Sequence, residues 1–364
     1  MKKSNGMTCR RRLIQAITGG EIDRVPFSPF LAYFFEHLDA ATRSKGMFAY
    51  LRAMGADPLL RGSGSAFTTV SRRCSQEEIL RGTSRAVIYH TPHGDLRAEY
   101  TYSPAGETWF LTRHPVSTPE DLKLLEAYFE DLQIVEAIGP YNELHRSYGE
   151  EALDLPIIGV NMKTAYQSLL EEWAGTENLV YLTFDAPEQL GCTLAAIQEK
   201  NDRTVRLTAE TEADGAIFWE DSSTTNLSPG LYDRYIRPEI TCWAAVFREH
   251  GKFLVQHACG YIKDLIPLMT AQGIQAIESL TPEPTGNLPL DQIWDGIPEE
   301  VAVIGGIDPT ILLNATLEEL QHHAQRLLDV SQKRRFILAN SDSCPPHVEY
   351  EKFLMLSRLV KEQS

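Results

Sequence analysis

The sequence lacks long apolar runs, paired cysteines and an excess of positive charge. No stretch approaches the roughly 18 consecutive apolar residues that a membrane-spanning helix needs, so we expect no membrane segment. No apolar run of signal-peptide length follows the basic N-terminal residues. The six cysteines show no short-range disulfide pattern, which indicates a reducing compartment, and the cytoplasm is the expected location.

The balance of charge is strongly negative. The chain carries 34 Lys and Arg against 50 Asp and Glu, for a net charge of −16. Because nucleic-acid binding requires a basic surface, this balance argues against a DNA- or RNA-binding protein and leaves small molecules and proteins as partners. With 43% hydrophobic residues over 364 positions, the chain is long and apolar enough to bury a sizeable core.

Apolar strand-like segments alternate with helical patterns over most of the chain. Eight such segments lie near residues 25, 57, 155, 215, 253, 274, 301 and 336. Alternation of strands and helices predicts a parallel sheet, and eight units fit an α/β fold of the closed (β/α)₈ TIM-barrel type. We therefore expect a single barrel domain over residues 1–364.

Residues 66–115 have a different character. Three β-rich runs, 86–90, 95–102 and 107–113, are separated by turn sequences that contain Pro and Gly. This pattern predicts a small antiparallel β meander inserted into the larger scaffold. Helices are predicted to follow it over residues 119–127 and 130–138.

Two apolar strands end in potential metal ligands. In Lys252–Gly260 (KFLVQHACG), His257 and Cys259 are two positions apart, so both side chains can point to the same side. In Arg335–Cys344 (RFILANSDSC), a similar strand runs into Cys344. One imidazole and two thiolates are a usual ligand set for zinc, and an open fourth position is typical of a catalytic site. The sequence predicts one zinc ion held by these three residues.

Each of these residues alone also has an ordinary structural interpretation. A buried cysteine usually behaves as a small hydrophobic residue, and a histidine near a strand end is usually hydrogen-bonded. The metal-site interpretation is favoured by the spacing and by the position of both segments at strand ends. Other acidic residues fall at predicted strand ends, where barrel enzymes place their chemistry: Glu220, Asp221, Glu278 and Asp308.

Several short segments resemble a known family. They are Asp23–Pro26 (DRVP), Thr91–Leu96 (TPHGDL), His257–Gly260 (HACG), Gly305–Pro309 (GGIDP) and Cys344–Pro346 (CPP). With them the chain resembles the uroporphyrinogen decarboxylase superfamily and, within it, the zinc-dependent, corrinoid-linked methyltransferases. Decarboxylases of that superfamily carry an arginine-rich segment after the first strand. Here Pro29–Phe34 reads PFLAYF, so decarboxylation is not expected.

The resemblance implies a function and a ligand set. His257, Cys259 and Cys344 look like the zinc ligands, and Glu278 is the candidate for an exchangeable fourth ligand. The family often has Gly before the late cysteine, where this chain has Ser343. No cobalamin-binding segment is apparent, so the corrinoid cofactor is expected on a separate corrinoid protein. The implied reaction moves a methyl group between that cobalt and a small substrate, a methoxylated aromatic or a thiol.

Further roles and alternatives remain open. Glu220 and Asp221 are the candidate catalytic residues, because a carboxyl group can hydrogen-bond the substrate or supply a proton to a leaving phenolate. Aromatic residues could line the mouth or belong to the core: Phe30, Tyr33, Phe34, Phe218 and Trp219. The alternative functions are a decarboxylase-like lyase without metal and a non-catalytic protein that binds zinc or a tetrapyrrole.

Overall fold

The computed structural model describes residues 6–362, which fall into two compact units. The first unit comprises the described residues up to 65 together with 139–157 and 209–362. The second comprises residues 66–138 and 158–208. The single domain expected over residues 1–364 stays a prediction.

Parallel strands form the centre of the first unit, which confirms the predicted α/β class. Its main sheet has the order β13-β12-β11-β10-β9, and β1 pairs in parallel with β8. Isolated parallel bridges join Phe27 to Leu338 and Ile157 to Ile217. The bounds are β1 Leu59–Arg61, β8 Leu153–Leu155, β9 Gly215–Trp219, β10 Phe253–His257, β11 Ala276–Leu280, β12 Ala302–Ile307 and β13 Phe336–Asn340.

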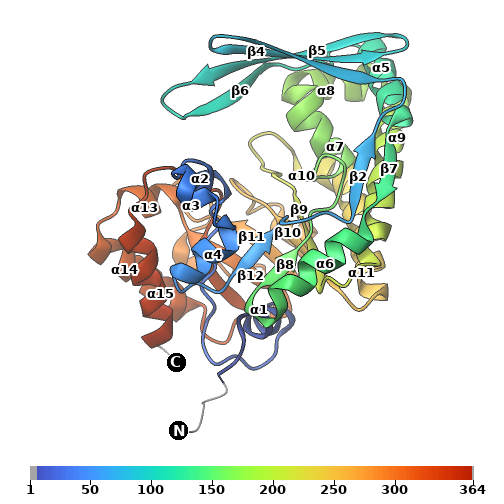
Figure 1. Cartoon of the computed structure of the whole chain (residues 1–364). Coiled ribbons are helices and arrows are strands. Elements are labelled where there is room, and N and C mark those ends of the chain that lie inside the picture. The colour runs from blue at the N-terminus through green and yellow to red at the C-terminus, as the bar shows by residue number, and fades with distance from the viewer. Residues whose placement is uncertain (1–5, 363–364) are drawn as a thin grey trace. The chain divides into compact units, whose positions relative to one another are not determined.

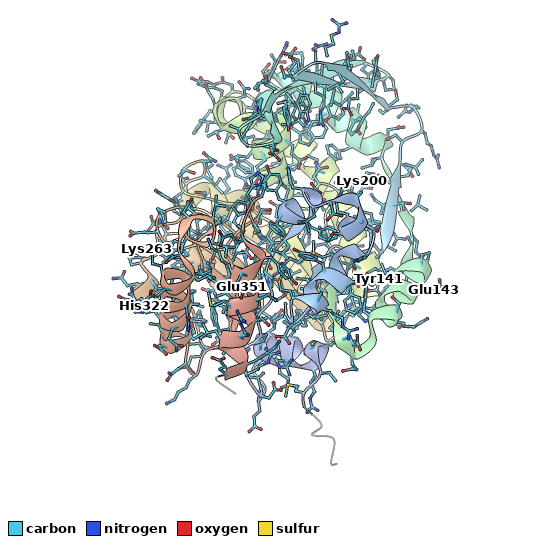
Figure 2. All side chains as sticks on the ribbon, turned by 60° about the vertical axis from the view of Figure 1, so that its left-hand side comes forward. Tyr141, Glu143, Lys200, Lys263, His322 and Glu351 are labelled. Carbon is cyan, nitrogen blue, oxygen red and sulfur yellow. The ribbon has the colours of Figure 1, made fainter. Side chains whose placement is uncertain are left out.

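Helices accompany these strands along the chain. Figure 1 shows β10, β11 and β12 beside one another, with α14 and α15 next to them in red. The helices are α1 Cys9–Thr18, α2 Ala32–Glu36, α3 Ala40–Arg43, α4 Gly46–Ala53, α6 Ile138–Tyr148, α10 Pro229–Leu231, α11 Arg237–Glu249, α12 Ile266–Thr270, α13 Pro309–Asn314, α14 Leu317–Val330 and α15 Tyr350–Glu362. Short 3₁₀ turns lie at Gly149–Glu151 and Leu290–Gln292, and a π-helical segment at Tyr232–Ile236. Figure 2 shows the labelled side chains of Lys263, His322 and Glu351 at the surface.

The core of the first unit is built from one face of its strands. Alternate residues of the strands, such as Ile217, Val255 and Ile304, pack in one buried cluster that also contains Leu13 of α1. Burial of each such side chain contributes about 1.5–3 kcal/mol. Because side chains alternate along a strand, Val255 is followed on the same face by His257.

The second unit contains the antiparallel sheet. Its four strands are hydrogen-bonded in the order β3-β4-β5-β6, and a separate antiparallel ladder joins β2 to β7. The strands are β2 Phe67–Val70, β3 Ser75–Arg81, β4 Ser84–Thr91, β5 Gly94–Ser103, β6 Thr108–Arg113 and β7 Gln133–Glu136. The helices are α5 Pro119–Asp131, α7 Ala165–Ser168, α8 Gly175–Asp185 and α9 Pro187–Ala209, with a π-helical segment at Leu169–Trp173.

The predicted meander is confirmed, with one strand more than expected. The sequence missed β3 because its exposed polar residues lack an apolar alternation. The helix predicted over residues 130–138 is wrong, since α5 ends at Asp131 and residues 133–136 form β7. Ile134 and Val135 favour the extended conformation and pair with β2. Among the described residues, no helix combines the length and the apolar character needed to cross a bilayer.

The buried carboxylate of Asp131 fixes the backbone segment that leads into β3 of the antiparallel sheet. Oδ2 of Asp131 accepts hydrogen bonds from the backbone N–H groups of Arg72, Arg73 and Cys74 at 2.9, 2.8 and 2.9 Å. These bonds, led by the one from Cys74, hold the pKa of Asp131 well below its usual range. We expect Asp131→Ala to lower the free energy of unfolding by about 2–4 kcal/mol, because three backbone donors lose their acceptor.

The pH dependence follows from the sign of this shift. A carboxyl group with a lowered pKa in the folded protein stabilises it above the pKa of the unfolded chain, and this contribution is lost as the pH falls through the folded value. Urea unfolding at neutral and acidic pH should therefore show the difference between wild type and Asp131→Ala shrinking on acidification. A difference that stays constant, or that grows in acid, would contradict this assignment.

Candidate metal centre

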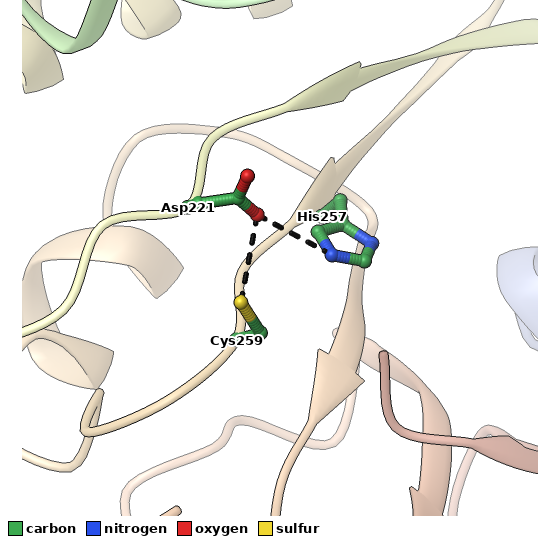
Figure 3. Close-up of side chains that lie close together, drawn as sticks. All are labelled: Asp221, His257 and Cys259. Carbon is green, nitrogen blue, oxygen red and sulfur yellow. Dashed lines mark hydrogen bonds and ion pairs between the residues drawn. The ribbon is translucent and has the colours of Figure 1, made fainter. Parts of the chain in front are cut away.

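Two neighbouring strand ends bring three potential metal ligands together. Asp221 follows β9, His257 ends β10 and Cys259 lies two residues further on. Oδ1 of Asp221 is 3.4 Å from Nε2 of His257 and 3.5 Å from Sγ of Cys259 (Figure 3). One ligand atom from each residue lies within 4.8 Å of the other two.

These distances fit a divalent metal ion. Zinc bonds to O, N and S ligands of about 2.0–2.3 Å imply tetrahedral edges of about 3.3–3.8 Å between ligand atoms. The distances from Oδ1 of Asp221 to Nε2 of His257 and to Sγ of Cys259 fall in this range. Carboxylate, imidazole and thiolate are all common zinc ligands. The residue types and these two separations therefore fit zinc, and the third separation, between the ligand atoms of His257 and Cys259, is at most 4.8 Å.

A buried carboxylate and an arginine lie on the other side of His257. Nδ1 of His257 is 3.1 Å from Oε2 of Glu278, and Glu278 forms an ion pair with Arg61. Burial opposes the protonated form of His257, but the hydrogen bond to Glu278 and the charge of Asp221 raise its pKa. Burial also acts to raise the pKa of Glu278, but the Arg61 charge and the His257 hydrogen bond hold it below its ordinary value.

Two of the five aromatic candidates flank the site. The rings of Phe30 and Trp219 stack at 5.1 Å, and their centroids lie 5.7 and 4.7 Å from that of His257. The other three pack elsewhere in the same unit: Phe218 against Trp243, Phe34 against Phe353 and Tyr33 against His37.

The loop after β13 presents a residue that the sequence did not suggest. Asp342 has a φ of 106°, which a non-glycine residue rarely adopts. Burial raises the pKa of Asp342, whereas the charge of His257 and a hydrogen bond with Cys259 act to lower it. These interactions place the Asp342 carboxyl group next to the side chains of His257 and Cys259. Asn340 holds this turn, since its Nδ2 donates to the carbonyl oxygens of Asp342 at 2.6 Å and of Phe30 at 2.9 Å.

The structure does not bring Cys344 into the same cluster. Its Sγ is 3.5 Å from the carbonyl oxygen of Pro345, and its backbone N–H donates to the carbonyl of Phe30. The side chain is fully buried, and burial strongly raises the pKa of the thiol. Within residues 6–362, the only group of three close ligand atoms found is Asp221, His257 and Cys259. The role of Cys344 as a ligand stays a prediction.

The remaining acidic candidates have other surroundings. Glu220 is completely buried, its backbone N–H donates to the carbonyl of His257 at 3.0 Å, and its charge contributes, after burial, to the raised pKa of Tyr232. Asp308 caps α13 by accepting from the backbone N–H of Thr310 and binds the hydroxyl of Thr285. The catalytic role of Glu220 stays a prediction.

Comparisons with known proteins agree with this fold. A family model described as Uroporphyrinogen decarboxylase (URO-D) matches residues 103–363. The chain is 27% identical over 219 residues to a uroporphyrinogen decarboxylase from Koribacter versatilis (strain Ellin345), a match that spans 58% of this chain and 59% of that relative.

Solved structures give a second comparison. A methyltransferase from Methanosarcina mazei aligns with a TM-score of 0.65 at 12% identity, over 98% of this chain and 99% of that chain, which shows a common fold. A B12-independent methionine synthase from Shewanella sp. W3-18-1 in complex with selenomethionine aligns over 93% of this chain and 98% of that chain. Its TM-score is 0.46 and its identity 12%.

Proposed function

This chain belongs to the uroporphyrinogen decarboxylase family, and on that premise we propose that it is a zinc-dependent methyltransferase. The methyl group would pass between a small substrate and the cobalt of a separate corrinoid protein. The observation that carries this proposal is the cluster of Asp221, His257 and Cys259, whose N, O and S donors are spaced for one divalent ion.

The arrangement of the strands supports a site at the mouth of a barrel. Bridges at Phe27 and Ile157 extend the main sheet at both ends, and the backbone N–H of Asp57 donates to the carbonyl of Phe27. We propose that these contacts complete a (β/α)₈ barrel. Asp221, His257 and Cys259 would then lie at the carboxyl ends of its strands, where such barrels carry their active sites.

In the proposed site, the zinc ion and the side chains have different roles. When bound, zinc lowers the pKa of a thiol or acts as a Lewis acid on an ether oxygen. Asp221, His257 and Cys259 would hold it, with Asp342 beside them. The stacked rings of Phe30 and Trp219 would keep water from one side of His257. Asp221, whose side chain is 37% exposed, would also hydrogen-bond a substrate.

A small apolar cavity next to Phe30 supports an aromatic substrate. Its volume is about 200 Å³, and its lining is mainly apolar, including Phe30, Leu31, Met47, Leu51 and Leu59. Arg61 also lines it, but its guanidinium is already paired with Glu278. The lining therefore favours a methoxylated aromatic ring over a highly charged substrate such as a polycarboxylated porphyrinogen.

Methyl transfer to cobalt tests this function directly. We expect the zinc-loaded protein, supplied with a purified corrinoid protein, to convert the bound cob(I)alamin to methylcobalamin with a methoxybenzoate or methoxyphenol as methyl donor. Cys259→Ala should lower the rate at least 100-fold, and uroporphyrinogen should not be consumed. Decarboxylation of uroporphyrinogen without methyl transfer would establish the lyase alternative. Zinc binding with neither reaction, over a panel of ethers and thiols, would favour the binding-protein alternative.

A further inference from the structure

We propose that Arg61 and Glu278 are positioning residues that orient the His257 ring, so that Nε2 and not Nδ1 is offered to the metal ion. This inference rests on the proposed zinc site. It gives Glu278 a role other than that of the fourth ligand implied by the family resemblance. It also gives a function to Arg61, which the sequence alone did not single out.

The two ring nitrogens of His257 face different partners. Nδ1 is 3.1 Å from Oε2 of Glu278, and Nε2 is 3.4 Å from Oδ1 of Asp221. Figure 3 shows the second ring nitrogen turned away from Asp221 and Cys259. An ion bound on the Nε2 side, between Asp221 and Cys259, therefore has the imidazole ring between itself and Glu278.

Arg61 determines which atom carries the proton. Its Nε donates to Oε1 of Glu278, while Nη1 and Nη2 lie 3.1 and 3.3 Å from the carbonyl oxygens of Leu59 and Ser28. A guanidinium is always charged and only donates, and an ionised carboxylate only accepts. In the neutral imidazole, Nδ1 of His257 therefore donates to Glu278, and Nε2 keeps the lone pair that binds a metal ion.

The backbone and the neighbouring rings fix this arrangement. His257 and Glu278 are direct partners in the parallel pairing of β10 and β11. The strand register shifts between Glu278 and Leu280, where Ser279 has a φ of 71°, and such a bulge re-aims neighbouring side chains. Phe30 packs on both groups, with its ring 5.3 Å from the Arg61 guanidinium and 5.7 Å from the imidazole. The Arg61 and Glu278 side chains are only 4% and 2% exposed, so water does not compete for their bonds.

The test uses cobalt(II) in place of zinc, because its visible spectrum reports the ligand set. We expect Glu278→Ala to weaken cobalt and zinc binding 10- to 100-fold, the usual effect of losing the carboxylate behind a ligating histidine. The wavelength and intensity of the cobalt bands should stay the same, since no ligand is lost. As a single substitution, Arg61→Gln should weaken metal binding to a smaller degree than Glu278→Ala. Added to Glu278→Ala, it should not lower the metal affinity further.

Asp308→Asn is the matched control. Asp308 is a buried carboxylate at the end of β12, and it accepts hydrogen bonds from Thr285, Thr310 and Ile311. It should lower stability but leave metal affinity and the cobalt spectrum unchanged. A cobalt spectrum altered by Glu278→Ala would show that Glu278 is a ligand and overturn the proposal. Unchanged affinity in both Glu278 and Arg61 variants would also overturn it.

A second readout separates this proposal from the proposed function. If wild type binds neither metal, the zinc-dependent function fails. Long-range ¹H–¹⁵N NMR of the metal-free protein then decides the positioning role. With neutral imidazole, we expect the His257 proton on Nδ1 in wild type and a shift toward Nε2 in Glu278→Ala. A proton on Nε2 in wild type would refute the orientation whatever the metal content.

Discussion

Replacing Cys259 by alanine is expected to lower the affinity for zinc at least 100-fold. The thiolate is the softest donor in the cluster, and its loss leaves an imidazole and carboxylates, which hold zinc less tightly. His257→Ala should have an effect of similar size, because it removes the imidazole around which Asp221 and Glu278 are arranged. Competition with a chromophoric chelator under reducing conditions measures these affinities.

The zinc affinities of further single-residue variants test which other side chains bind the ion. Cys242→Ala, an exposed cysteine on α11, should leave zinc affinity unchanged and controls for loss of any thiol. We expect Asp221→Ala and Asp342→Ala each to weaken binding about 10-fold or more, and Cys344→Ala to change it less than 3-fold. If Cys344→Ala weakens binding as much as Cys259→Ala, the loop after β13 rearranges to supply Cys344, as the sequence predicts. Equal zinc binding by Cys259→Ala and wild type would refute the metal centre.

The position of His257 could be predicted from the sequence, because it follows from the periodicity of a strand. The apolar run before His257 indicates a buried strand, and alternation puts His257 on the same face as Val255. The same rule, applied to Leu59 and Arg61 on β1, would have placed Arg61 at the equivalent position. It was missed because β1 has only three residues, too few to show a period.

The loop after β13 could not be predicted by the same argument. Beyond Asn340 the chain leaves the extended conformation, so alternation no longer tells which side chain faces the cluster. The left-handed conformation of Asp342 and the hydrogen bonds of Asn340 to Phe30, 310 positions away, turn Asp342 toward Cys259. This turn depends on tertiary contacts, which leave no local signal around Cys344. The polar edge strand β3 was missed for a similar reason, since pairing with β4 determines it.

Asp57→Ala is expected to lower the free energy of unfolding by about 3–5 kcal/mol, because it leaves the buried Arg12 and the half-buried Arg24 without their shared partner. Asp57 is completely buried. Its carboxylate accepts from Nη1 of Arg12 at 2.6 Å, from Nη1 and Nη2 of Arg24 at 2.6 and 2.9 Å, and from the backbone N–H of Phe27 at 3.1 Å. These contacts join α1, the Phe27 segment and the approach to β1. Urea unfolding followed by circular dichroism measures the loss.

This network also gives a physical reason for the DRVP sequence at Asp23–Pro26. Arg24 pairs with Asp57, and Asp23 pairs with Arg12 at 2.6 Å, so the motif joins three segments by ion pairs rather than by apolar contact. Asp23→Ala is the matched control: its side chain is 38% exposed, so water can solvate Arg12 in its place and the loss should stay near 1 kcal/mol. Asp57→Asn keeps the shape of the side chain but not its charge. Its loss of unfolding free energy should lie between those of Asp57→Ala and Asp23→Ala. If the free energies of unfolding of both Asp57 variants lie within about 1 kcal/mol of the wild-type value, the ion-pair network does not fix the segment around Phe27. Apolar packing around Phe27 must then do so.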